Sequence, residues 1–123
     1  MVTFEENING ILKQILESYH KLESLNDKPG ELEIIKIESL KINGFFKVII
    51  KKLEFSQINS DNYVKLLKRI KHYLNNYEFN REIEMISNLY SNDPNRLKNI
   101  RLIIIESLQD KQLMGLIATI LKS

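Results

Sequence analysis

The chain has 123 residues, of which 43% are hydrophobic and 28% are charged, and its formal net charge at pH 7 is +2. This length and balance predict one globular domain over residues 1–123 with a single core. Cysteine is absent, and only four Gly and two Pro are present. Disulfide frameworks, thiolate chemistry and Cys-based metal sites are therefore excluded, and the many tight turns of a β-sandwich or barrel are disfavoured.

Residues 4–25 are predicted to form the first helix. Thr3 and Glu6 have the spacing of a capping box. Apolar residues then recur at helical intervals, namely Ile8, Ile11, Leu12, Ile15, Tyr19 and Leu22. Residues 26–30 should end this helix, because they contain a Pro-Gly pair.

Residues 31–55 support two interpretations. The Asn43-Gly44 dipeptide lies between two apolar runs, and the alternation after it is typical of a half-buried strand, which together indicate a β-hairpin. A helical stripe also fits the segment, through Ile35, Ile42, Phe46, Ile49 and Leu53. We favour the hairpin, with the helix as the alternative.

The remaining sequence is helical in pattern. Ser60-Asp61 can cap a helix that extends to about residue 76, and another is expected over residues 78–91. Asp93-Pro94 is a typical helix start, and we expect a break near Asp110 before a final apolar helix over residues 113–121. The prediction is a mainly α domain of about five helices with a β-hairpin near residues 31–55. An all-α bundle is the alternative.

The N-terminal residues lack the basic start and apolar run of a signal peptide, and no apolar stretch reaches the roughly 20 residues of a transmembrane helix. We therefore expect a cytoplasmic protein. The final helix also lacks the basic polar face of an interfacial helix, so no membrane role is predicted. Its apolar character indicates a core position, with contact to a partner or a second copy as the alternative.

No catalytic constellation is visible in the sequence. The two histidines, His20 and His72, are far apart and have no metal-ligand spacing, and the four glycines are isolated. Carboxylate pairs occur only as near neighbours in sequence, at Glu5/Glu6, Glu31/Glu33 and Glu82/Glu84. We predict that the protein is not an enzyme and that it uses neither a cofactor nor a metal ion.

Charge is distributed unevenly along the chain. Residues 1–40 carry a formal charge of −4 and residues 41–72 carry +6, while residues 73–123 balance. Within the basic third, Lys65, Lys68, Arg69 and His72 have the i, i+3, i+4, i+7 spacing of one helix face. The predicted partner-binding residues are Lys65, Lys68, Arg69, Lys71 and His72, with Lys47 and Lys51 added from the expected hairpin.

These features predict a non-catalytic adaptor or inhibitor-like protein that docks on a protein partner through its basic face. The alternative is a nucleic-acid-binding accessory subunit of a nucleoprotein complex, because lysines on one face can follow a phosphate backbone. The face contains one Arg and no interleaved aromatic residue, and the pI of about 8.8 lies below the value of about 9 typical of nucleic-acid-binding domains. We therefore favour a protein partner.

Overall fold

The first helix forms where its capping signal predicts. In the computed structural model, which describes residues 3–56 and 60–122, α1 spans Phe4–Ser24. The Thr3 Oγ1 atom accepts a hydrogen bond from the backbone N–H of Glu6 at 3.1 Å, which satisfies one of the free donors at the helix start. The inward face of α1 is fully buried at Ile8, Leu12, Ile15 and Leu22.

The predicted hairpin at residues 31–55 is wrong, because one helix, α2, spans Glu31–Ser56. Asn43 and Gly44 lie in the interior of α2. The residues that suggested the helical alternative are all buried, namely Ile35, Ile42, Phe46, Ile49 and Leu53. Burial of this stripe against the other helices outweighs the local turn preference of Asn43-Gly44.

Four further helices follow, and the described residues contain no strand: α3 spans Asp61–Asn76, α4 Asn80–Leu89, α5 Pro94–Gln109 and α6 Leu113–Lys122. The Asp93 side chain caps α5 by accepting from the backbone N–H groups of Asn95 and Arg96 at 3.0 and 3.3 Å. The expected break at Asp110 is present as a short 3-10 turn, η1, over Asp110–Gln112.

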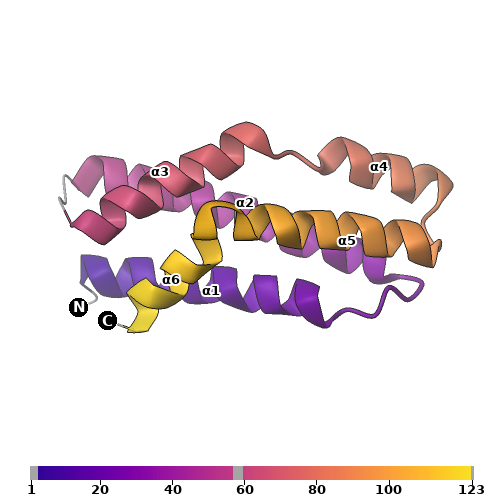
Figure 1. Ribbon diagram of the computed structural model, residues 1–123, viewed down its shortest axis with the longest axis horizontal. Coiled ribbons are helices and arrows are strands. Elements are labelled where there is room, and N and C mark those ends of the chain that lie inside the picture. The colour runs from indigo at the N-terminus through magenta and orange to yellow at the C-terminus, as the bar shows by residue number, and fades with distance from the viewer. Residues whose placement is uncertain (1–2, 57–59, 123) are drawn as a thin grey trace.

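The helices form an all-helical bundle (Figure 1). α1 and α2 run in opposite directions, and α3 and α4 follow each other along one side of the bundle. In the view of Figure 1, α5 runs between α1 and the side formed by α3 and α4. α6 turns away from α5 and packs against α1 and α3. Its apolar side chains enter the core, as the core interpretation of the last segment predicts: Leu113, Met114, Leu116, Ile117 and Ile120 are buried. Within residues 3–56 and 60–122, no helix combines the length and the apolar character needed to cross a membrane.

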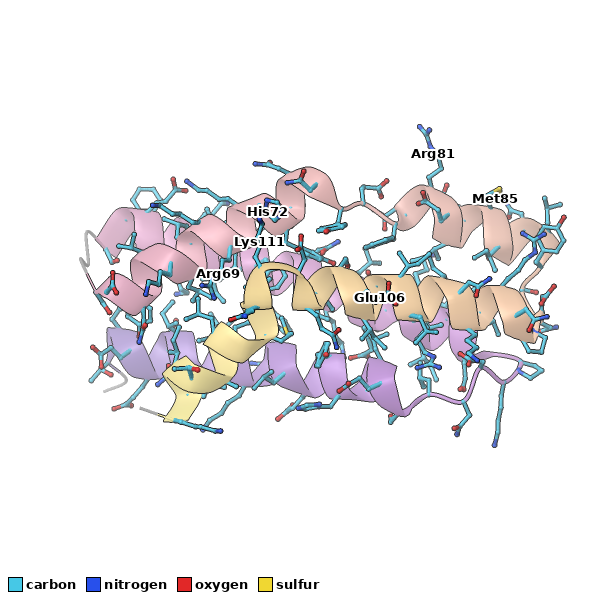
Figure 2. All side chains as sticks on the ribbon, viewed as in Figure 1. Arg69, His72, Arg81, Met85, Glu106 and Lys111 are labelled. Carbon is cyan, nitrogen blue, oxygen red and sulfur yellow. The ribbon has the colours of Figure 1, made fainter. Side chains whose placement is uncertain are left out.

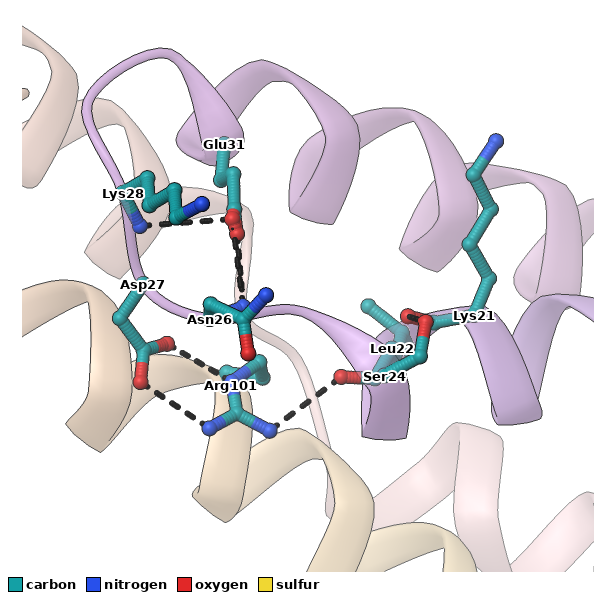
Figure 3. A network of polar contacts seen from close by, with 8 residues as sticks. All are labelled: Lys21, Leu22, Ser24, Asn26, Asp27, Lys28, Glu31 and Arg101. Atoms are coloured by element: carbon teal, nitrogen blue, oxygen red, sulfur yellow. Dashed lines mark hydrogen bonds and ion pairs between the residues drawn. The ribbon is translucent and has the colours of Figure 1, made fainter.

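A buried ion pair fixes the connection between α1 and α2 (Figure 3). The Arg101 guanidinium on α5 donates to both carboxylate oxygens of Asp27, at 2.7 and 3.0 Å, and to the carbonyl oxygen of Leu22 at 3.3 Å. The Glu31 carboxylate accepts from the backbone N–H groups of Asn26 and Lys28 at 2.8 and 3.3 Å. This network ties the α1–α2 connection to α5.

Candidate functional site: a basic hollow at the α5–α6 break

A hollow lies where α3 faces the break between α5 and α6. Its cavity volume is about 380 Å³, and we call it the basic hollow; it is lined by Lys68, Arg69, His72, Lys111 and Gln112. Figure 2 shows Arg69, His72 and Lys111 at this junction, the first two on α3 and the third on the turn between α5 and α6. Two segments far apart in the sequence therefore build one site.

The fold of each segment brings these side chains together. Leu66, Ile70 and Tyr73 turn one face of α3 into the core, which leaves Lys68, Arg69 and His72 toward the surface. Residues Lys111 and Gln112 have φ values of 55° and 56°, in the left-handed region that non-glycine residues rarely adopt. This backbone turns the chain from α5 into α6.

A hydrogen bond also connects the two walls of the basic hollow. The Arg69 Nη1 atom lies 3.4 Å from the carbonyl oxygen of Gln112, to which it donates. This distance is at the long end for an N–H···O bond, so the contact orients the guanidinium without using its other donors. Arg69 consequently keeps donors for a ligand in the hollow.

The Asp110 carboxylate lies next to His72, a lining residue of the basic hollow, and is held by two donors. Its Oδ2 atom accepts from the Tyr77 hydroxyl at 2.6 Å and from His72 Nε2 at 3.0 Å. The hydrogen bond from Tyr77, followed by the one from His72, holds the pKa of Asp110 below its usual value. Asp110 is therefore a stable carboxylate that positions its neighbours.

Hydrogen bonds occupy both ring nitrogens of His72. Asn76 Nδ2 lies 3.1 Å from His72 Nδ1, and an amide NH₂ group can only donate, so Nδ1 accepts. The Nε2 atom then carries the proton that is donated to Asp110. With both ring nitrogens engaged, His72 supports the hollow rather than acting as a base.

Three cations of the hollow have no ion-pair partner in the part of the chain that the structure describes. Among the described residues, Lys68, Arg69 and Lys111 form no ion pair, and the nearby Asp110 carboxylate is held by His72 and Tyr77. By contrast, Lys65 pairs with Asp61 at 3.3 Å and Lys71 pairs with Glu54 at 3.2 Å. Three cations that form no ion pair among the described residues therefore meet in the basic hollow.

The structure brings together three of the seven predicted binding residues. Lys68, Arg69 and His72 line the basic hollow. The other four do not: Lys65 pairs within α3, Lys71 pairs across to α2, and Lys47 and Lys51 lie on the exposed surface of α2. The two α2 lysines were placed on a hairpin strand, so their expected setting is wrong.

Sequence reasoning missed Lys111, which lies 42 positions after Arg69. The predicted break near Asp110 was the available signal, because a break exposes the residues that turn the chain. Among residues 3–56 and 60–122, no group of three His, Cys, Asp or Glu side chains could hold a metal ion. The scan of protein-family models and the searches of curated proteins and of solved structures found no match to this chain.

Proposed function

We propose that this chain is a non-catalytic binding protein that docks on a protein partner through the basic hollow. The observation that carries the proposal is the convergence of Lys68, Arg69 and Lys111, none of which has an ion pair among the described residues, on one cavity. Two lysines and a guanidinium placed together attract an anionic group, and the guanidinium can bind a carboxylate with two parallel hydrogen bonds. The ligand is an acidic side-chain cluster on the partner.

The arrangement of charge favours a protein partner over a nucleic acid. A phosphate backbone is bound by a continuous basic band, commonly with aromatic side chains on which bases stack. Lys71, Lys47 and Lys51 lie away from the hollow, and the residues that line the hollow include no Phe, Tyr or Trp. A compact cluster of three cations suits a local acidic patch.

The state of the polar groups supports a binding role without catalysis. Both nitrogens of His72 and one oxygen of Asp110 are engaged in hydrogen bonds, so neither residue is poised to move a proton to a ligand. Lys68 and Lys111 act as fixed positive charges.

The cytoplasmic location remains a prediction from the composition of the chain.

Charge reversal in the basic hollow tests this function. The variant Lys68→Glu/Lys111→Glu should bind a fluorescent Glu- and Asp-rich peptide about tenfold more weakly than the unmodified protein, a loss of about 1.4 kcal/mol. The matched control is Lys13→Glu/Lys98→Glu, which changes the net charge equally at two exposed lysines outside the hollow. Fluorescence anisotropy at low and at physiological salt measures the affinities.

The same assay includes labelled single- and double-stranded DNA and RNA. The proposal predicts weaker binding to these nucleic acids than to the acidic peptide at physiological salt. Tighter binding to nucleic acid with a steep loss of affinity as salt rises would replace the proposal with the nucleic-acid alternative. Equal affinities of the hollow variant and the control variant for the acidic peptide would refute a role for the hollow.

A further inference from the structure

A second surface, on the outer side of α2, is apolar although it faces solvent. Ile37, Leu40, Val48 and Phe55 are exposed to 43%, 46%, 41% and 85%, and we call these four residues the outer stripe. Their spacing of 3, 8 and 7 residues keeps them on one side of a helix, and 18 residues extend over about 27 Å. The outer stripe therefore follows α2 through five turns.

The outer stripe lies opposite the part of α2 that enters the core. Ile35, Ile42, Phe46 and Ile49 are fully or almost fully buried against the other helices. An amphipathic surface helix needs one apolar face, and its opposite face is normally polar. In Figure 1, α2 lies behind α5, so the core-facing side of α2 is the one covered by the bundle. The second apolar face is left without a partner in the described chain.

Positive charge borders the outer stripe. Between residues 41 and 52, α2 carries four lysines, Lys41, Lys47, Lys51 and Lys52. The carboxylates of the same stretch are already engaged, because Glu54 pairs with Lys71 at 3.2 Å and the buried Glu38 lies 3.4 Å from Lys41. A surface that meets the outer stripe must therefore accommodate a basic border.

We propose that the outer stripe docks an amphipathic helix of a protein partner whose apolar face is bordered by Asp and Glu. The apolar faces would pack along α2 while the partner's carboxylates meet the flanking lysines. A second copy of this chain would bring the same lysines together, and like charges at an interface oppose association. Ile37, Leu40 and Val48 are less than half exposed and form a level surface for a helix, and Phe55, at 85% exposed, projects near its end.

This surface goes beyond the function proposed above, because it shares no residue with the basic hollow. The two surfaces can be tested separately. Substitutions in the outer stripe should leave the binding of the acidic peptide at the hollow unchanged, and substitutions in the hollow should leave the stripe intact.

Site-specific photocrosslinking in the native host tests the proposal. A photoreactive amino acid replaces Val48 in one variant and, as the control, Met85 in another; Met85 is 50% exposed on the outer side of α4 (Figure 2). Mass spectrometry then identifies the captured segment. We expect capture from the Val48 position, absent from the Met85 position, of a segment with helical apolar spacing and flanking Asp or Glu. Capture of a second copy of this chain, capture of a segment without that pattern, or equal capture at both positions would overturn the proposal.

The captured segment can then be made as a synthetic peptide and its affinity for the protein measured. Variants at two glycines, Gly44 and Gly10, serve as the test and its matched control. A Cβ atom at Gly44, which lies between Leu40 and Val48 in the outer stripe, or at Gly10 on α1, would meet no other atom within 4 Å. Gly44→Gln and Gly10→Gln should therefore both preserve the fold, but only Gly44→Gln should weaken binding, by about tenfold, because its side chain obstructs the partner helix. Phe55→Ala should have a similar effect.

Equal affinities of the Gly44 and Gly10 variants would contradict docking along the stripe. Sedimentation with vesicles of phosphatidylserine and phosphatidylcholine covers the lipid alternative. Binding to these vesicles that is lost in Phe55→Ala would assign the stripe to a membrane surface and overturn the proposal.

Discussion

The α1–α2 and α5–α6 connections are similar in backbone but different in how they use charge. Each places a non-glycine residue in the left-handed region, with φ of 63° at Asp27 in the first and 55° and 56° at Lys111 and Gln112 in the second. Each also contains one aspartate that accepts hydrogen bonds from residues distant in the sequence. The environment of that aspartate sets the two connections apart.

In the first connection the aspartate faces a buried cation. The side chains of Asp27 and Arg101 are only 13% and 11% exposed, and the two charges neutralise each other. In the second connection Asp110 is 34% exposed and accepts from Tyr77 and His72. Neither donor belongs to the three cations of the basic hollow: Lys68, Arg69 and Lys111 form no ion pair with Asp110 among the described residues. The first aspartate is therefore paired with a cation of the fold, whereas the second leaves Lys68, Arg69 and Lys111 without an ion pair among the described residues.

The largest effect is expected when the buried pair is broken. Arg101→Met leaves Asp27 without its cation and should lower the free energy of unfolding by about 2–3 kcal/mol, slightly less than for a fully buried pair. The measurement is urea denaturation followed by circular dichroism. Arg96→Met is the control, because Arg96 is 45% exposed and its pair with Asp93 is long, at 3.9 Å; its effect should stay below about 1 kcal/mol. Equal losses in the two variants would remove the distinction between the connections.

The sequence predicts most of the helices but not α2. The N-cap side chains of α1 and α5 form the hydrogen bonds that the sequence predicts, whereas Ser60 at the start of α3 forms no side-chain cap bond. All three helices bury apolar residues at helical spacing, so for them the local pattern agrees with the packing. α2 carries apolar residues on two faces, the buried Ile35 and Ile42 and the exposed Ile37 and Val48. This doubled pattern resembles the alternation of a strand, and only packing against the other helices decides between the two.

The candidate site could be predicted only in part for a similar reason. Helical spacing places Lys68, Arg69 and His72 together, and this holds within α3. Spacing cannot reveal that Lys111 joins them, because that contact depends on how α6 packs between α1 and α3. Nor does it reveal that Lys71 faces Glu54 on α2, since that pair crosses between helices.

Substitution by glycine in each of the two connections should change the stability of the protein by smaller amounts and in opposite directions. Gln112 has a positive φ, and it accepts the hydrogen bond from Arg69 through its backbone carbonyl, which a glycine retains. Gln112→Gly should therefore stabilise the protein by about 1 kcal/mol through relief of left-handed strain. Asp27→Gly relieves the same strain but leaves Arg101 unpaired, so a net loss of about 1–2 kcal/mol is expected. Thermal unfolding of both variants checks the opposite signs, and destabilisation by Gln112→Gly would show that strain is not the controlling factor.

The smallest effect concerns how stability depends on pH through the partly exposed Asp110. The folded-state pKa of Asp110 is lowered, so its contribution to stability is present above the unfolded pKa of about 3.9 and is lost as the pH falls through the lower folded value. The hydrogen bond from Tyr77 is the largest cause of the lowered pKa. Tyr77→Phe should therefore raise the pKa of Asp110 toward its ordinary value and move this loss of stability to higher pH.

Carboxyl NMR titration of Asp110, together with thermal unfolding between about pH 2 and 6, measures both changes. The control is Tyr90→Phe, because the Tyr90 ring lies under the Arg96 guanidinium, 3.6 Å from its Cζ atom, and donates to no carboxylate among the described residues. An Asp110 pKa that is the same in both variants would show that the Tyr77 hydroxyl does not hold the carboxylate. The donor to the aspartate would then no longer distinguish the α5–α6 connection from the α1–α2 connection, in which Arg101 is the donor to Asp27.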